Sequence, residues 1–339
     1  MGNGQAGLEA LEIAMAGAWS NKNVFITGCT GFVGYWLTEH LLSRGAAVTG
    51  LVHQADPRSH YCRFTLQERI TAVSGTLDDL PLLEQTLASR AIDTVFHLAA
   101  QSQVAAGSAS PLPTFETNIR GTWNMLEACR KNSGTVNAVV IASSGLAYGA
   151  QAQPPYTEEA PLQGTHPYGA SKACAEMLAA AYHAAYGLPV CATRCSSIFG
   201  PGDTDIRRLI PGTIMAALKK QPVVIRSDGT PRRDHLYVKD AAAAFCLLAE
   251  NIQPLKLAGE AFNFSAGAPV SVLELTNMIL TAMGAADLSV TVANTEQHEA
   301  QDRFLSIDKA KAVLGWMPRH AMPDALKETI ADYRTLEAS

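Results

Sequence analysis

The stretch NVFITGCTGFVGYWLTEHLLSRGAAVTGLVH, residues 23–53, decides the fold of this chain. Its first part, NVFITG (23–28), is a β-branched run that ends in glycine, and this pattern predicts a buried strand. GYWLTEHLLSRG (34–45) has the apolar periodicity of an amphipathic helix, and AAVTGLVH (46–53) has the composition of a second strand. A strand, a helix and a second strand in this order predict a βαβ unit of a parallel sheet.

Three glycines join the first strand to the helix. Gly28, Gly31 and Gly34 have the spacing GxxGxxG in TGCTGFVG. Glycines at such a junction permit a tight turn and the close approach of a pyrophosphate, with the N-terminus of the helix facing the phosphates. Three glycines alone are a weak signal, but their place at the first strand–helix junction predicts nucleotide binding rather than a merely flexible loop.

The chain continues this alternation of strands and helices up to about residue 196. Further strand candidates are RITAVSG (69–75), DTVFHLAA (93–100), NAVVIASS (137–144) and PVCATRC (189–195), and helical patterns over 80–90, 112–132 and 168–186 separate them. The alternation predicts an α/β fold with a Rossmann-like, doubly wound parallel sheet.

Beyond residue 196 the pattern becomes irregular. GPGDTDIRRLIPG (200–212) is rich in loop residues, the dipeptide Asp228-Gly229 predicts a hairpin, and the tail is mostly helical. We therefore expect two closely packed domains. They are an NAD-binding Rossmann domain over 20–195 with a returning segment about 236–262, and a smaller mixed substrate-binding domain formed by 196–235 and 263–339.

The composition is that of a globular protein, with 47% hydrophobic and 17% charged residues. A net charge of −5 gives no electrostatic case for binding nucleic acid or an anionic membrane. The seven cysteines contain no CxxC pair, so we expect free thiols, a cytoplasmic location and no metal site. LEALEIAMAGAW (8–19) lacks a basic n-region and is too short to span a membrane. Gly2 alone would suggest myristoylation, but position 6 is Ala6, where the myristoylation signal has Ser or Thr.

One tyrosine–lysine pair is a candidate for catalysis. In PYGASKACAE (167–176), Tyr168 lies about one helical turn before Lys172, so the two side chains share one face of a helix. A partly buried tyrosine beside a solvated lysine is the simplest interpretation of an isolated YxxxK. A lysine beside a phenol also favours the phenolate, which would make the tyrosine a usable base near neutral pH.

Five motifs decide between these interpretations. TGCTGFVG, HLAAQS, SSGLAYG, YGASK and GTPRRDHLYVKD resemble, in kind and in order, those of the extended short-chain dehydrogenases/reductases, the nucleotide-sugar epimerase/dehydratase group. The resemblance covers about residues 19–320. WSNKNVFITG and RLIPGTIMAALKKQPVVIRSDG are most similar to the CDP-glucose and GDP-mannose 4,6-dehydratase branches, and DRFLSIDKAKAVLGWMP resembles the CDP-glucose branch. With this order of motifs behind the pair, we interpret Tyr168 as the base.

The resemblance implies NAD as the cofactor, and the residues leave NADP open. Relatives that prefer NAD often have Asp near the end of the second strand and NADP users often have Arg, whereas this chain has His53 and Gln54 there, followed by Asp56 and Arg58. Thr76 stands where relatives often carry an Asp that contacts adenine. The residues implied to contact the cofactor are Gly28, Thr30, Gly31, Phe32, Val33, Gly34, His53, Leu77, Leu98, Ala99, Ala100, Tyr168 and Lys172.

The resemblance also implies roles in the reaction. Tyr168 would remove or return the proton of a sugar hydroxyl while hydride moves to or from nicotinamide. Lys172 would bind the nicotinamide ribose and lower the tyrosine pKa, and Ser144 would hydrogen-bond the substrate oxygen. The residues implied to contact a small-molecule substrate are Gln101, Ser102, Ser144, Gly145, Cys195, Ser197 and Arg233.

The two residues after the serine favour epimerisation over dehydration. Dehydratases of the family usually carry one or two acids there, which remove the C5 proton and protonate the leaving hydroxyl, whereas this chain has Gly145 and Leu146. An epimerase needs no such acid, because the keto sugar rotates and takes hydride back on its other face. A dehydratase would need its acid or base elsewhere. Cys195, His235 and the 101–108 loop are candidates, although lining or packing explains each more simply.

Two positions differ from the family in the substrate region. Ser197 stands where relatives usually carry an asparagine that contacts the nucleotide sugar, and His298 stands near their second diphosphate-binding arginine. Arg233 matches the first such arginine, with Arg232 beside it; a solvated hairpin pair is the other interpretation. One hypothesis is therefore a nucleoside or monophosphate substrate, with an elimination of unusual regiochemistry.

Other functions and the oligomeric state stay open in the sequence. A net keto-sugar reductase would exchange free NAD(P)H in every turnover, and a non-catalytic NAD-binding regulator would not need the intact catalytic set. Family resemblance implies a homodimer in which helices near 112–130 and 168–186 form a bundle. The small residues Ala175, Ala179 and Ala180 would allow close helix approach, and packing inside the monomer would explain them equally well.

Overall fold

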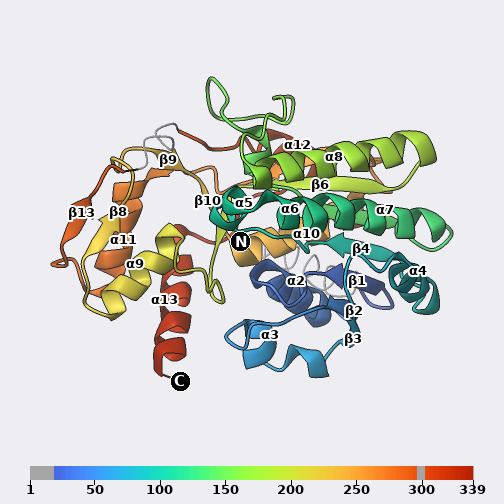
Figure 1. Ribbon diagram of the computed structural model, residues 1–339, viewed down its shortest axis with the longest axis horizontal. Helices are drawn as coiled ribbons and strands as arrows, with labels where there is room; N and C mark the ends of the chain where they lie inside the picture. Colours follow the sequence, from blue (N-terminus) through green and yellow to red (C-terminus); the bar gives the residue numbers. More distant parts are fainter. Residues whose placement is uncertain (1–18, 296–301, 339) are drawn as a thin grey trace, which may run out of the picture.

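The computed structural model describes residues 19–295 and 302–338, and Figure 1 shows their arrangement. The apolar pattern over residues 8–18, Gly2 and His298 lie outside the described residues. Among the described helices, none is long and apolar enough to cross a lipid bilayer.

A seven-stranded sheet forms the centre of the larger part of the molecule. Its strands are β1 (Asn23–Thr27), β2 (Ala47–Val52), β3 (Thr71–Ser74), β4 (Thr94–His97), β5 (Ala138–Ala142), β6 (Val190–Cys195) and β11 (Ala261–Phe264). The strand order is β11-β6-β5-β4-β1-β2-β3, and every neighbouring pair is parallel. The order reverses between β1 and β4, which is where ligands bind in sheets of this kind. The predicted Rossmann-like fold is confirmed.

Helices cover both faces of the sheet, as Figure 1 shows. On one face lie α2 (Phe32–Ser43) and α10 (Val238–Asn251), and on the other lie α4 (Leu80–Ser89), α7 (Gly121–Lys131) and α8 (Pro167–Tyr186). Successive residues of β1 point to opposite faces: Val24 and Ile26 belong to the core beneath α2 and α10, and Phe25 belongs to the other. Strands buried on both faces explain the continuous apolar runs in the sequence.

The segment expected to be one helix over 112–132 contains an irregular turn. It consists of α6 (Pro111–Phe115), the π-helical turn η2 (Glu116–Arg120) and α7. Such turns are frequent at functional sites. Asn118 lies in this turn and is buried beside the ends of the central strands.

The smaller part of the molecule gathers around α9 (Leu209–Leu218), α11 (Val272–Met283) and α13 (Met322–Ala338), at one end of the sheet (Figure 1). Its short strands are β7 (Ser197–Phe199), β8 (Val223–Ile225), β9 (Arg232–Arg233), β10 (His235–Tyr237), β12 (Val270–Ser271) and β13 (Val290–Val292). The remaining elements are α3 (His60–Arg63), η1 (Leu66–Glu68), α5 (Val104–Ala109), η3 (Gly145–Tyr148) and α12 (Asp308–Leu314).

The hairpin predicted at Asp228-Gly229 is wrong. The chain does turn there, because Gly229 has a φ of +86° and the Asp228 carboxylate accepts a hydrogen bond from the Thr230 amide. The flanking strands then take other partners: β8 pairs with β13 and β9 pairs with β12. Pro231 follows the turn and has no N–H to donate to a ladder, so a tight hairpin register is not available.

The chain returns to the large sheet after β10, through α10 and β11. Contacts from the last helix hold the two parts together. The Asp332 carboxylate on α13 lies 3.0 Å from the His60 Nε2 and 3.1 Å from the Arg63 guanidinium, and it accepts a hydrogen bond from the Gly202 amide. The expected domain boundaries stay a prediction.

Candidate active site

The candidate site lies where the carboxyl ends of the central strands meet. Gly28 follows β1, His53 follows β2, Leu98 follows β4 and Ser144 follows β5, while Cys195 ends β6. Because all these strands are parallel, their ends lie at one edge of the sheet. The fold therefore brings together residues that are far apart in the sequence.

The glycine loop is packed too tightly for side chains at two of its positions. Gly28 has a φ of +82°, and a Cβ there would lie 2.7 Å from the Ala99 amide nitrogen. A Cβ on Gly34 would lie 2.0 Å from the Gly28 carbonyl oxygen. Gly31, by contrast, is exposed and caps the N-terminus of α2. The loop thus holds the start of α2 close to the ends of β1 and β4.

The start of α2 offers an anion site. The first amides of a helix, here those of Phe32 and Val33, have no partner within the helix and carry the positive end of its dipole. The Thr30 hydroxyl donates to the Gln54 carbonyl at 3.2 Å and so ties the glycine loop to the chain after β2. Exposed backbone and a helix N-terminus at a strand switch point fit the pyrophosphate of a dinucleotide.

The chain after β2 is exposed and polar. His53 is exposed, and the Arg58 guanidinium contacts the Asp56 carboxylate at 2.8 Å. These residues lie beside the expected ribose position. The Leu77 side chain is buried in the core, and its carbonyl accepts a hydrogen bond of 2.8 Å from the side-chain amide of Asn124.

Tyr168 and Lys172 lie in the first two turns of α8. His166 caps this helix by accepting a hydrogen bond of 3.1 Å from the Gly169 amide, and Pro167 occupies its first position. The His166 ring stacks on the Tyr168 ring with an interplanar angle of 5°. The Lys172 Nζ lies 5.8 Å from the centre of the Tyr168 ring. The predicted helical pairing of the two residues is observed.

The surroundings of Tyr168 have opposing effects on the pKa of its phenol. Burial raises the pKa of the phenol, whereas a hydrogen bond with the Ser144 side chain and the charge of Arg208 lower it. Ser144 also caps η3, because its hydroxyl accepts a hydrogen bond of 3.1 Å from the Leu146 amide. The Ser144 side chain is therefore held by the Leu146 amide and forms a hydrogen bond with Tyr168.

Lys172 is buried, with 6% of its surface exposed, and its Nζ donates to the Ala142 carbonyl at 2.7 Å. Burial lowers the pKa of its ammonium group to about 8, against the charge of Glu176, which raises it. His97 lies nearby on β4, and burial together with the charge of Lys172 lowers the pKa of this imidazole to about 3. Lys172 is thus the cation of this part of the site.

Asn118 is a site residue that the sequence reasoning missed. Its side-chain oxygen accepts from the Gln101 amide at 2.7 Å, and its nitrogen donates to the Gln101 carbonyl at 3.0 Å and to the Ser171 hydroxyl at 2.9 Å. It therefore joins the chain after β4 to α8. The only signal in the sequence was an asparagine within the helical pattern over 112–132. Ser102, next to Gln101, is exposed at the same edge.

Gly145 occupies the position at which the family resemblance places a dehydratase acid. The residue is buried, and a Cβ there would lie 3.3 Å from the Cys195 carbonyl and 3.4 Å from the Leu305 side chain. Burial raises the pKa of the Cys195 thiol to about 12. Burial, assisted by the charges of Arg208 and Arg233, lowers the pKa of His235 to about 3. The thiol keeps its proton and the imidazole stays neutral near pH 7.

The other implied substrate residues lie on the short strands next to this position. Ser197 is exposed on β7 and pairs with His235 on β10. Arg233 is half-buried on β9, whereas Arg232 is exposed and donates to the Pro269 carbonyl at 2.8 Å. The strand pairing thus brings Ser197 and Arg233 to one region.

Arg208 is a second residue that the sequence reasoning missed. Its guanidinium contacts the buried Asp203 carboxylate and the Ile198 carbonyl, each at 2.5 Å. It stands just before α9, and its charge lowers the pKa of both Tyr168 and His235. The loop-rich stretch that carries it has no periodicity from which its position could be deduced.

Comparison with known proteins identifies the group to which this arrangement belongs. Residues 24–264 match the NAD dependent epimerase/dehydratase family. The chain is 30% identical over 321 residues to a dTDP-glucose 4,6-dehydratase of Streptomyces antibioticus, and the match covers 92% of each chain.

Solved structures agree on the fold. A UDP-glucose 4-epimerase of Thermotoga maritima, solved with UDP-glucose, superposes with a TM-score of 0.83 at 27% identity, over 92% of this chain and 99% of that one. DesIV, a dTDP-glucose 4,6-dehydratase of Streptomyces venezuelae solved with NAD, gives 0.82 at 29% identity, over 92% and 97%. This protein therefore belongs to the NAD-dependent epimerase/dehydratase family and is an enzyme of the extended short-chain dehydrogenase/reductase type.

Proposed function

We propose that this enzyme epimerises a nucleotide sugar by removing hydride from a sugar carbon and returning it to the opposite face. The absence of an acid directly after Ser144, where the chain has Gly145 and Leu146, is the observation that carries this proposal. Gly145 is also buried, and a Cβ there would lie 3.3 Å from the Cys195 carbonyl, so even a small side chain would require a slight shift of that carbonyl. The site therefore has the groups for oxidation and return of hydride, and it has no acid at this position for elimination.

The proposed roles follow from the contacts of the catalytic residues. NAD, when bound, accepts hydride from the sugar carbon and gives it back. Tyr168 takes the proton of the sugar hydroxyl as hydride leaves that carbon, and returns the proton when hydride comes back. Ser144 hydrogen-bonds the reacting oxygen, and Lys172 holds the ribose while its positive charge favours the phenolate. Proton and hydride are both restored, so the enzyme ends each turnover unchanged.

The three alternative sources of an eliminating group are poorly suited to the task. The Cys195 thiol, with a pKa near 12, is a weak acid near neutrality, and the His235 imidazole, with a pKa near 3, is a weak base. The loop 101–108 contains no acidic or basic side chain. These properties support epimerisation.

An anionic substrate fits the charges around the short strands. The charges of Arg208 and Arg233 both lower the pKa of His235, so both guanidinium groups lie near this residue. Guanidinium groups pair well with phosphate oxygens. Relatives whose names state a substrate act on nucleotide diphosphate sugars. We therefore assign the sugar nucleotide to the part formed by 196–235 and 263–339, with Arg233 on the phosphates. A nucleoside or monophosphate substrate is the outcome that would contradict this assignment.

Dehydration is the second candidate, because relatives along most of the chain are named 4,6-dehydratases. One experiment separates the candidates: UDP-, GDP- and CDP-hexoses, with simple nucleosides beside them, are incubated with enzyme and NAD and followed by mass spectrometry and NMR. Epimerisation gives an isomer of unchanged mass, and dehydration gives a product lighter by one water. A keto-sugar reductase would instead consume NADH with a keto substrate. Only an isomer supports the proposal.

We also propose that the enzyme is a homodimer that pairs through α6, α7 and α8. Leu112, Met177 and Tyr186 on these helices are between 61% and 69% exposed, and Trp123 is 41% exposed. Exposed apolar side chains of this size on helices that contact one another favour a protein partner. Ala175 and Ala179 are buried within the chain and only Ala180 is exposed, so the alanines serve mainly internal packing.

Light scattering after size exclusion tests the dimer. Met177→Glu should give monomers, whereas Leu255→Glu, at an exposed apolar residue beyond α10, should leave the mass of the wild type unchanged. A monomeric wild type would contradict this proposal. All seven cysteines are free, which agrees with the proposed location in the reducing cytoplasm.

A further inference from the structure

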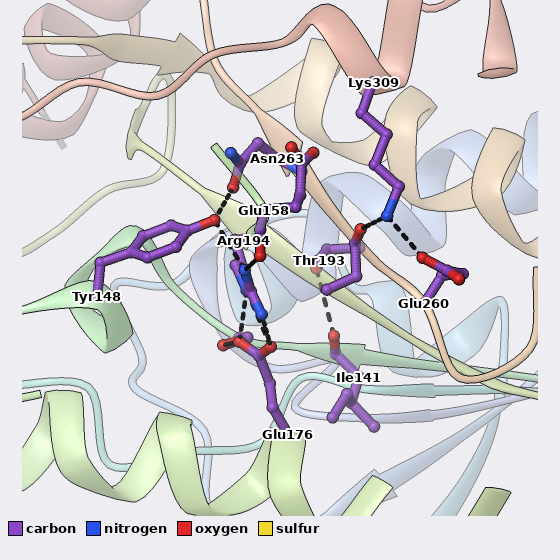
Figure 2. A network of polar contacts seen from close by, with 11 residues as sticks. Ile141, Tyr148, Glu158, Glu176, Thr193, Arg194, Glu260, Asn263 and Lys309 are labelled. Carbon is purple, nitrogen blue, oxygen red and sulfur yellow. Dashed lines mark hydrogen bonds and ion pairs between the residues drawn. The ribbon is translucent and has the colours of Figure 1, made fainter. Parts of the chain in front are cut away.

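The buried pair Glu176–Arg194 lies behind the catalytic residues. Glu176 stands on α8 one turn after Lys172, and Arg194 stands on β6. The guanidinium forms hydrogen bonds of 2.7 to 3.1 Å with both carboxylate oxygens, and the side chains are 8% and 6% exposed. Figure 2 shows the two groups facing each other between the helix and the sheet. A buried ion pair rarely adds stability over apolar packing of the same volume. The burial of Glu176 and Arg194 therefore suggests a role other than stability.

The pair continues a set of contacts between the end of β5 and α8. Three successive residues after and at the end of β5 contact three residues of α8 that are one turn apart. Lys172 donates to the Ala142 carbonyl, Ser143 donates to the Glu176 carboxylate, and the Ser144 side chain bonds that of Tyr168. Two of these contacts involve the proposed catalytic residues, and the third involves Glu176.

Arg194 links the Glu176 carboxylate to residues on the side away from Lys172. Its Nη1 donates to the Tyr148 hydroxyl at 2.8 Å and to the Glu158 carbonyl at 2.9 Å. The Tyr148 hydroxyl in turn donates to the Asn263 side chain on β11 at 2.8 Å, as Figure 2 shows. The Asn263 amide donates to the Glu158 carboxylate at 2.8 Å. The carboxylate of Glu176 is thereby anchored to two strands and to the loop after η3.

Glu176 also supplies a negative charge near Lys172. The ionisable groups that face Lys172 are Tyr168 and Glu176 on the same helix and His97 on β4, with Arg194 behind Glu176. The His97 imidazole, with a pKa of about 3, is neutral, whereas the charge of the Glu176 carboxylate raises the pKa of Lys172. The carboxylate is therefore the counter-charge of the lysine. Arg194 partly offsets that charge.

We propose that Glu176 and Arg194 are positioning residues, which hold Lys172 in register with the end of β5 and set the electrostatic field at its ammonium group. This inference rests on the proposed role of Lys172 beside the nicotinamide ribose. Neither side chain of the pair is assigned contact with the substrate. Their effect reaches the reaction through the lysine.

The proposal predicts opposite effects from the two halves of the pair. Glu176→Gln removes the counter-charge and leaves the positive charge of Arg194 unopposed, so the Lys172 ammonium should lose its proton at lower pH, by about one pH unit or more. Arg194→Met leaves the carboxylate unopposed, so the lysine should hold its proton to higher pH. If the pair served packing alone, the pH at which Lys172 loses its proton would change in the same direction in both variants, or not change at all.

Competitive labelling of Lys172 with acetic anhydride, followed across pH by mass spectrometry, measures the midpoint of the Lys172 titration. The measurement needs no sugar substrate. The control is Glu250→Gln, which breaks the half-buried pair with Arg44 between α10 and α2 and should leave the midpoint unchanged. A midpoint in Glu176→Gln equal to that of the control would overturn the proposal. Because the readout needs no turnover, a failed search for the substrate does not affect it.

Two further variants cover the case in which Glu176→Gln or Arg194→Met does not fold. Arg194→Lys keeps the charge and should restore a midpoint near that of the wild type. Ser143→Ala keeps both charges and removes only the contact with Glu176, so NAD binding, measured by calorimetry, should weaken several-fold as Lys172 loses its register. Unchanged NAD affinity in Ser143→Ala, or a midpoint in Arg194→Lys far from the wild type, would contradict the proposal.

Discussion

The N-terminal half of α8 and the short strands of the smaller part hold their polar side chains in different ways. On α8, Tyr168, Lys172 and Glu176 each have a defined partner at the end of β5 or in the two residues after it, and most of their surface is buried. On the short strands, Ser197 and Arg232 are exposed. The first region holds the groups that would carry proton and hydride chemistry common to many sugars. The second leaves room for the groups that choose one substrate, which explains why the reaction class is easier to infer than the substrate.

The largest expected effect is on stability in the buried region. Arg194→Met leaves the Glu176 charge buried and unpaired, and such losses cost about 3–5 kcal/mol of unfolding free energy. Arg232→Met removes an exposed side chain and should change it by less than about 0.5 kcal/mol. Urea denaturation followed by circular dichroism compares the two. Equal losses in the two variants would erase the contrast between the regions.

The next effect is on turnover. Tyr168→Phe removes the proposed acid–base group and should lower kcat by roughly 10²-fold or more, while NAD still binds and the fold is kept. Tyr182→Phe is the matched control on the same helix, because that hydroxyl contacts Glu127 away from the strand ends. Steady-state kinetics and NAD titration measure both. Near-normal turnover in Tyr168→Phe would remove the tyrosine from the mechanism.

The third effect concerns the exposed region. Arg233→Ala should raise KM for a nucleotide diphosphate sugar by about tenfold or more with little change in kcat, because one charge-assisted hydrogen bond contributes about 1.5–3 kcal/mol. Arg232→Ala, whose side chain contacts the Pro269 carbonyl, should leave KM near normal. An unchanged KM in Arg233→Ala would favour a substrate without a diphosphate.

The smallest effect is a pH dependence. The pKa of Lys172 is lowered to about 8 by burial, so the group is charged below that pH and neutral above it. Since the charge favours the Tyr168 phenolate and holds the ribose, kcat/KM should fall as pH rises through about 8. The profile of the free enzyme shows this directly. A profile that keeps rising well above pH 8 would mean that the charge of Lys172 is not needed.

The sequence predicted the parallel sheet and the pairing of Tyr168 with Lys172, because both depend on local periodicity. Gly28 and Gly34 were recognised for the same reason, since their spacing follows from one strand–helix junction. Arg208 and the Glu176–Arg194 pair depend instead on contacts between distant elements, which no local pattern records. The hairpin at Asp228-Gly229 was wrong because partner choice by β8 and β9 is a tertiary property.

The most direct test of the account follows hydride itself. A nucleotide sugar that carries deuterium on the carbon to be oxidised is incubated with enzyme holding one equivalent of NAD, and the product is examined by NMR and mass spectrometry. The account predicts many turnovers per NAD, a product of unchanged mass, and deuterium retained on the inverted carbon. Turnover that stops after one equivalent, or a product that has lost water, would contradict the return of hydride to the same carbon.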